Sequence, residues 1–106
     1  MFKIEEFISL VQNHNFVEAH EVLEADWKGQ KKIGNKDIAK FLQALINGTT
    51  SIALYKKGRV EASQKVWNTF EKYKDLIDTI SLENHQRYIY AIELLENKYA
   101  QKEELI

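Results

Sequence analysis

The side chains best suited to chemistry are concentrated in one short stretch, residues 13–27. They are His20, Glu21, Glu24 and Trp27. If the stretch is helical, His20 and Glu24 are four residues apart and therefore neighbours on the helix surface, within reach of an imidazole to carboxylate hydrogen bond. An acid and a base beside a large aromatic ring can have shifted pKa values, which acid–base chemistry requires. The pattern predicts a polar site on this helix.

Other interpretations of the pair stay open. A His and a Glu on the border of a core commonly do no more than satisfy each other and a nearby backbone group. Zinc binding of the protease type needs a second His at the position of Glu24, and the sequence HEVLE supplies only two ligands. His14 and His85 would add ligands only if the fold brought them close. We therefore expect no metal and no cofactor.

The helix that carries the pair has its own start signal. Asn15 followed three residues later by Glu18 matches a capping box, so the helix is predicted to begin near Phe16 and to run to about residue 27. One face has apolar residues at helical spacing: Phe16, Ala19, Leu23 and Trp27. This spacing predicts that the Trp27 indole is largely buried, so that Trp27→Ala would destabilise the fold by about 3 to 5 kcal/mol.

The next helix adds two polar candidates. After a predicted loop bracketed by Gly29 and Gly34, residues 36–57 form the longest stretch with helical apolar spacing, which predicts the central helix. Gln43 and Asn47 lie one turn apart on it, and both amides need hydrogen-bond partners if they are buried. We include them with the residues of the first helix as candidate binding residues.

Apolar spacing and turn residues predict the remaining helices. Residues 3–12 form a short amphipathic helix, residues 60–77 form another after the turn at Gly58, and Ser81 caps a last one. Gly48, inside the central helix, lowers helix stability by about 1 kcal/mol relative to Ala, so we expect another helix backbone to approach closely there.

The fold class follows from these elements. The sequence contains no proline and no strand-like alternation bounded by turns. We predict an all-α protein, a single helical domain over residues 1–106, with about five helices in a compact antiparallel bundle around the apolar helix 36–57. A chain of 106 residues is long enough for one hydrophobic core and too short for two.

Composition excludes several classes of partner. The 15 basic and 16 acidic residues nearly balance, so we expect no nucleic-acid partner. Residues 41–55 carry no charge but are too short to cross a bilayer, and we expect no membrane partner. The absence of cysteine and of a signal peptide favours a cytoplasmic location. One group of basic side chains is interpreted as a solvated loop, with an anion site as the alternative: Lys28, Lys31, Lys32 and Lys36.

The residues on the two candidate helices resemble the pattern of a known family. That pattern has an aromatic residue, then Glu-Ala-His-Glu, another Glu and a Trp, and this chain supplies Phe16, Glu18, Ala19, His20, Glu21, Glu24 and Trp27. On the following helix the family reads roughly Leu-Gln-Gly-Leu-Ile-Gln, where this chain has Ala44 in place of Gly and Asn47 in place of Gln. Further on, Tyr55 stands where the family often has His. Over residues 13–67 the chain is similar to the bacterial and archaeal family catalogued as domain of unknown function 309.

The resemblance implies a small helical fold and no particular activity. It also implies that His20 and Glu24 on one helix and Gln43 and Asn47 on the next form one buried polar cluster shared by the two helices. We predict a binding or interaction module in which this cluster orders the core or receives a small polar ligand or a partner residue. The two Trp and five Tyr also suggest a partner face, such as that of a homodimer. The alternative is a hydrolase-type enzyme with His20 as general base and Glu24 or Glu21 as its acidic or orienting partner.

Overall fold

The computed structural model describes residues 2–105 and is built from helices. Their bounds are α1 Ile4–Gln12, α2 Phe16–Lys32, α3 Lys36–Lys56, α4 Val60–Tyr73 and α5 His85–Ala100, with the short 3₁₀ helices η1 Lys74–Asp78 and η2 Lys102–Leu105. No strand occurs among the described residues. The predicted all-α class with five main helices is confirmed.

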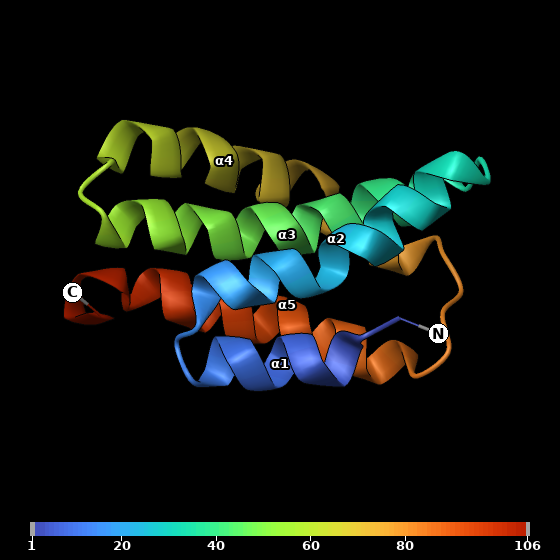
Figure 1. The fold of residues 1–106 in the computed structure, drawn as a ribbon, viewed down its shortest axis with the longest axis horizontal. Helices are drawn as coiled ribbons and strands as arrows, with labels where there is room; N and C mark the ends of the chain where they lie inside the picture. The colour runs from blue at the N-terminus through green and yellow to red at the C-terminus, as the bar shows by residue number, and fades with distance from the viewer. Residues whose placement is uncertain (1, 106) are drawn as a thin grey trace.

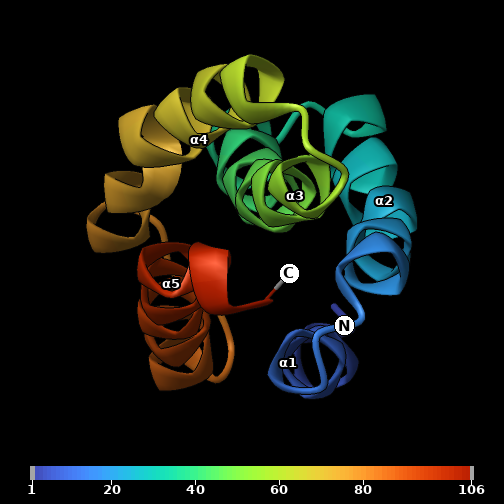
Figure 2. The same cartoon turned by 90° about the vertical axis from the view of Figure 1, so that its left-hand side faces the viewer.

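The helices are arranged around α3, as predicted. Figure 1 shows that α2 and α4 run antiparallel to α3 on either side of it. In the end-on view, α1 and α5 lie together below these three helices, with α1 beside α2 (Figure 2). This arrangement gives α2 and α3 a shared seam along most of their length.

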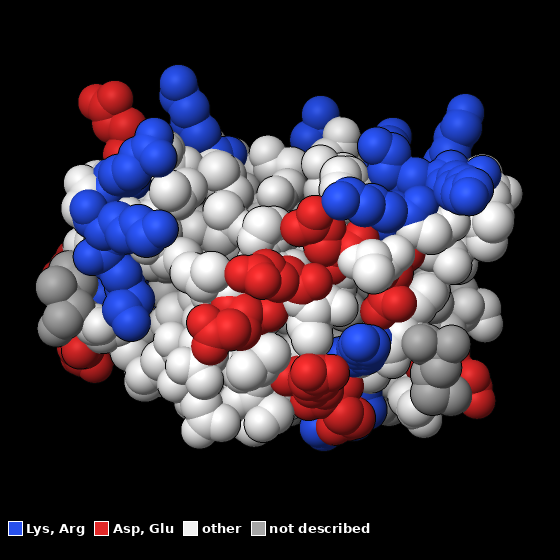
Figure 3. Space-filling model, in the orientation of Figure 1, with Lys and Arg blue, Asp and Glu red and all other residues white. Residues whose placement is uncertain are grey.

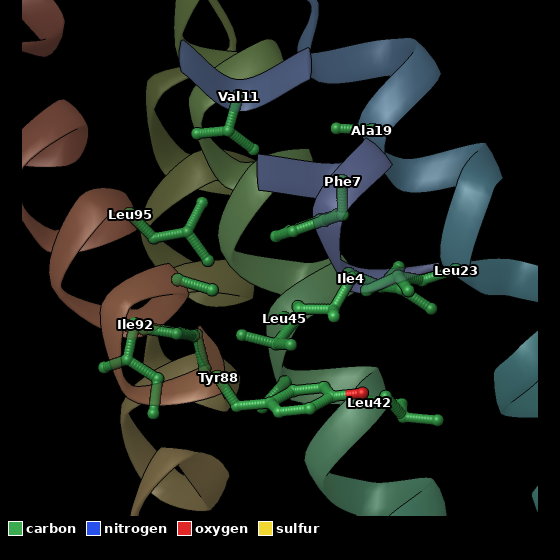
Figure 4. Packing of buried hydrophobic residues seen from close by; sticks show 14 of the residues in the cluster. Ile4, Phe7, Val11, Ala19, Leu23, Leu42, Leu45, Tyr88, Ile92 and Leu95 are labelled. Carbon is green, nitrogen blue, oxygen red and sulfur yellow. The ribbon is translucent and has the colours of Figure 1, made fainter. Parts of the chain in front are cut away.

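Apolar side chains from several helices meet in one core. Phe7 of α1, Leu23 of α2, Leu45 of α3 and Leu95 of α5 are fully buried and point toward one another (Figure 4). Removing each such side chain from water stabilises the fold by roughly 1.5 to 3 kcal/mol. The core therefore holds α2 and α3 in fixed register.

Buried polar and small residues set the distance between α3 and its neighbours. The hydroxyls of Ser51 on α3 and Ser63 on α4 each donate to the backbone carbonyl of the other residue, at 2.7 and 2.8 Å. At Gly48 an added Cβ would lie 3.0 Å from Leu95 Cδ1 and 3.1 Å from Phe70 Cδ1. The prediction that another helix backbone approaches Gly48 is wrong, because the nearest atoms belong to side chains of α5 and α4.

The end of α2 differs from the prediction. The helix continues to Lys32, so Gly29 lies inside it, and the turn is made by Gly34 at φ +85°. Lys31 and Lys32 in the last turn favour this extension, because positive charge stabilises a helix C-terminus. A single glycine weakens a helix by only about 1 kcal/mol, which tertiary contacts can outweigh.

The predicted side-chain caps are also absent. Asn15 and Asn35 do precede α2 and α3, but neither makes a side-chain hydrogen bond to its helix. Asn35 Nδ2 instead donates to Gln30 Oε1 at 2.8 Å. The capping-box pattern located the start of α2 correctly but not its hydrogen bonding.

The C-terminal third contains two further corrections. The predicted helix 60–77 is α-helical only to Tyr73 and continues as η1. The last helix begins at His85 after Asn84, which has a left-handed backbone at φ 59°, so Ser81 is not its cap. After α5, residues 102–105 form η2, and Leu105 packs against the core. Within residues 2–105, no helix combines the length and apolar character that crossing a membrane requires.

Candidate functional site

The seam between α2 and α3 carries the residues singled out in the sequence. The two helices are antiparallel, so the start of α2 lies beside the last turns of α3 (Figure 1). A buried hydrogen bond fixes this end of the seam, because Thr49 Oγ1 donates to the carbonyl oxygen of Phe16 at 3.1 Å. The register brings the first turns of α2 opposite residues 50–56 of α3.

Helical periodicity places most of the candidates along this seam. His20, Glu24 and Trp27 follow one side of α2 at spacings of four and three residues. On α3, Gln43 and Asn47 lie on the same stripe as Thr50 and Leu54. All three α2 residues, and both amides, are partly buried.

Glu21 does not belong to the seam. Its side chain is exposed, in contrast to those of its neighbours His20 and Glu24. Among the charged side chains of Figure 3, carboxylates form a band across the middle of the face that is shown. Because its side chain is solvated, Glu21 is the weakest member of the predicted set.

His20 and Glu24 lie close together but are not enclosed. His20 Nε2 is 3.7 Å from Glu24 Oε2, and the two side chains are 38% and 35% exposed. Lys28 Nζ lies 2.8 Å from the other carboxylate oxygen, and this hydrogen bond and charge lower the pKa of Glu24. Glu24 is therefore ionised at neutral pH and is shared between an imidazole and an ammonium group on its own helix.

Trp27 lies at the edge of the core. It is partly buried against the core cluster, and Lys31 Nζ is 4.7 Å from the centre of the indole ring. The prediction that it is largely buried was too strong, because the ring packs at the margin of the core cluster and not inside it. The enclosed tryptophan is Trp67, which is 6% exposed.

The two amides of α3 do not complete a closed network. Within residues 2–105, no side-chain hydrogen bond joins Gln43 or Asn47 to His20 or Glu24. The reason is on α2 itself, where Glu24 faces Lys28. The buried polar cluster implied by the family resemblance is thus a row of partly exposed side chains along the seam.

A pocket opens at the His20 end of this row. It has a volume of about 160 Å³, and we call it the His20 pocket; its walls are Phe16, Val17, His20, Thr50, Ala53, Leu54 and Lys57. The hydroxyl oxygen of Thr50 is buried and has no hydrogen-bond partner within the described residues. A buried polar group without a partner is unusual and costs about 1 to 3 kcal/mol, so it needs an explanation.

A second pocket adjoins the first at the N-terminus of α2. This His14 pocket has a volume of about 350 Å³ and is lined by His14, Asn15, Phe16, Val17, Glu18, Ala53, Lys56 and Lys57. Four residues belong to both pockets: Phe16, Val17, Ala53 and Lys57. The two pockets therefore adjoin each other between α2 and α3, and we call them together the groove.

Sequence reasoning missed part of this groove. Thr50 continues the stripe of Gln43 and Asn47 at helical spacing, so the same periodicity could have identified it. His14 and Lys56 carried no comparable signal, because only the turn before α2 and the antiparallel register bring them together. Among residues 2–105 there is no group of three or more His, Asp or Glu side chains that could hold a metal ion.

Comparison with known proteins identifies a family and no close relative. No curated protein and no solved structure matches the chain. A family model matches residues 4–66, more than half of the chain, which span α1, α2, α3 and the first half of α4. That family is described as a domain of unknown function (DUF309).

Proposed function

The chain belongs to the DUF309 family, whose description names no activity, and from the geometry of its α2–α3 seam we propose that it is a binding module for a small polar ligand. The ligand site is the His20 pocket. Its location agrees with the family resemblance, because His20 belongs to the most specific part of the pattern. Glu24, Asn47, Gln43 and Trp27 continue the seam beyond the pocket and extend the binding surface.

One observation carries the proposal: the pocket beside His20 is lined by a residue, Thr50, whose buried hydroxyl has no partner among the described residues. The pocket has a volume of about 160 Å³, and most of its other lining side chains are apolar. Small-molecule sites typically combine apolar walls with a few polar groups that orient the ligand. His20 and Thr50 would supply those groups, with a small side-chain movement exposing the hydroxyl.

The hydrolase alternative has less support. Glu24 is not in the wall of the His20 pocket, and its carboxylate is held by Lys28. The lowered pKa of Glu24 keeps it ionised, so it is a poor proton donor at neutral pH. A role in orienting the His20 imidazole is geometrically feasible, but the residues around the pocket provide no activated nucleophile.

Two general features accompany the proposal. Side chains from α1 to α5 share one core, which supports a single domain. The absence of cysteine fits a reducing compartment such as the cytoplasm. The exposed large apolar residues, Val17, Ile33, Val60 and Tyr90, do not by themselves define a homodimer face, because isolated apolar side chains are common on protein surfaces.

The test is a nuclear magnetic resonance titration with a panel of small amides, alcohols and carboxylates. We expect binders to shift backbone amide signals around His20 and Thr50. Ala53→Leu places three more carbon atoms in the groove and should abolish these shifts. Ala62→Leu is the matched control, because Ala62 lines a separate surface hollow on α4. The proposal is wrong if shifts cluster elsewhere, or if folded Ala53→Leu protein responds like the wild type.

A further inference from the structure

We infer that the ligand of this groove carries an oxyanion, a carboxylate or a phosphate, that binds in the His14 pocket against Lys56 and Lys57. The inference rests on the proposed function, because the apolar and hydrogen-bonding part of the same ligand would occupy the His20 pocket. It assigns the chemical class of the ligand, which neither the family description nor the α2–α3 seam alone provides.

The shape of the groove separates a charged end from a less polar end. The His14 pocket, of about 350 Å³, has two lysines, a histidine and one carboxylate, that of Glu18, in its walls. The His20 pocket is smaller and has only one of these lysines, Lys57, in its walls, together with His20, Thr50, Leu54 and the shared apolar residues. A ligand that lies across the shared residues would therefore have its charged group beside the lysines.

The lysines at this end form no ion pair with a carboxylate among residues 2–105. They are Lys56 and Lys57, which line the pocket, and Lys98. Lys56 Nζ lies 5.6 Å from the centre of the Phe16 ring, in the floor of the groove. Figure 3 shows lysine and arginine side chains gathered at this end of the molecule, where α3 and α5 end in Figure 1.

His14 has a lysine as its partner, which is unusual. Lys98 Nζ lies 2.8 Å from His14 Nε2, and since an ammonium group can only donate, Nε2 accepts and the ring is neutral. Partial burial and the charges of Lys98 and Lys56 lower the pKa of His14. A bound oxyanion would relieve this repulsion between positive groups.

The backbone at the start of α2 also favours binding of a negative group. Asn15 makes no side-chain cap, so the first amide groups of α2 have no side-chain acceptor, and they belong to residues that line the pocket. Free amides and the helix dipole favour a negative group at this position. This contribution supplements the two lysines and is not the basis of the inference.

A second hollow provides an internal comparison. At the N-terminus of α3, a surface hollow is lined by Gly34, Asn35, Lys36, Asp37 and Ile38. This hollow also lies at the start of a helix without a side-chain cap, but its lining has one lysine and one carboxylate, that of Asp37, so its formal charges balance. If a helix start were sufficient, anions would bind equally well at both places.

The experiment uses three probes at low ionic strength: sodium butyrate, sodium phosphate and neutral butyramide. Backbone amide shifts of the ¹⁵N-labelled protein are followed for each probe. We expect butyrate or phosphate to shift the amides of residues 16–18, and added NaCl to weaken this binding. The tighter of the two anions identifies the head group as carboxylate or phosphate.

Charge variants test the lysines directly. In the double variant Lys56→Gln/Lys57→Gln the dissociation constant of the anion should rise by about five- to tenfold or more. Lys36→Gln, the matched control at the start of α3, should leave it unchanged. Saturating anion should also raise the pKa of His14 in the wild type, measured on its ring signals. The charged groups around the ring are Lys98, Lys56, Lys57 and Glu18, and a bound anion adds a second negative charge that favours the protonated imidazole.

The outcomes separate the two proposals. If butyramide shifts His20 and Thr50 as strongly as butyrate does, the binding module stands and the anion inference is wrong. If the anions shift residues 16–18 but not His20 or Thr50, the anion site stands and the His20 pocket is not the ligand site. Equal shifts at residues 16–18 and 36–38, or no shift with any probe, overturn the inference.

Discussion

Two neighbouring threonines of α3 have opposite hydrogen-bonding environments. The Thr49 hydroxyl donates to the carbonyl of Phe16, whereas the buried Thr50 hydroxyl has no partner among the described residues. Thr50→Val should therefore increase the free energy of unfolding by about 1 kcal/mol, because it removes an unpaired buried hydroxyl. Thr49→Val should lower it by about 1 kcal/mol. Urea denaturation measures both, and a destabilised Thr50→Val would show that the hydroxyl is satisfied.

The same pair connects stability with function. Functional polar groups often lower stability, so a residue whose replacement stabilises the protein while weakening ligand binding is marked as a binding residue. Thr50→Val is expected to do both, and Thr49→Val neither. If the Thr50 hydroxyl had a structural role, Thr50→Val would lower stability, as Thr49→Val does.

The two tryptophans should contribute unequally. Trp67 is 6% exposed and stacks on Tyr99 with ring centres 3.8 Å apart, whereas Trp27 is only partly buried. We expect Trp67→Ala to lower the free energy of unfolding by about 3 to 5 kcal/mol. Trp27→Ala should lower it by only about 1 to 2 kcal/mol, because less apolar area returns to water. Equal losses in thermal or urea unfolding would show that Trp27 belongs to the core.

For the candidate site, the sequence predicted the helix positions of the side chains better than it predicted which partners they contact. Periodicity predicted that His20, Glu24 and Gln43 lie along the seam of two adjacent helices, and the structure shows that α2 and α3 pack side by side. Periodicity could not show that Glu24 turns to Lys28, since several partners lie within one helical turn and side-chain rotamers decide among them. Nor could it reveal the groove at His14, which depends on the packing of α2 against the end of α3.

Among the elements, α2 and α3 each contain an internal glycine with different surroundings. Gly29 has no atom within 4 Å of an added Cβ, whereas at Gly48 the fully buried Leu95 and Phe70 lie 3.0 and 3.1 Å away. Gly29→Ala should raise the free energy of unfolding by about 0.5 to 1 kcal/mol through helix propensity. Gly48→Ala should lower it by about 1 to 3 kcal/mol through overpacking. Urea unfolding of the two variants checks this, and stabilisation by both would mean that Leu95 and Phe70 yield easily.

The two glycines also show how far sequence predicts helix boundaries. Apolar spacing located all five main helices, because amphipathic faces persist over several turns. Glycine was ambiguous, since Gly34 and Gly58 end helices with left-handed backbones while Gly29 does not. The start of α5 after Asn84 also lacked a local signal, because the left-handed backbone of Asn84 is not evident from the sequence.

For the molecule as a whole, one buried phenol links pH to folding. Tyr88 of α5 is 3% exposed and meets Phe41 of α3 edge to face, with ring centres 6.0 Å apart. Burial, followed by the negative charges of Asp26, Glu5 and Glu83, raises the pKa of Tyr88 from 10.0 to about 12. The folded protein therefore keeps the phenol proton over a pH range in which the unfolded chain has lost it.

This difference predicts a loss of stability at alkaline pH. Between pH 10 and 12 the native state binds more protons at Tyr88 than the unfolded state does, so the free energy of unfolding falls as pH rises. The stabilisation is complete below pH 10, and its loss approaches about 2 to 3 kcal/mol once the folded phenol ionises. Urea unfolding from pH 9 to 12 should show this decline in the wild type and a shallower one in Tyr88→Phe. Parallel curves for the two proteins would contradict the prediction, since the remaining tyrosines and lysines titrate in both. A shallower curve for Tyr88→Phe would identify the phenol buried between α3 and α5 as a coupling point between proton release and unfolding of the whole bundle.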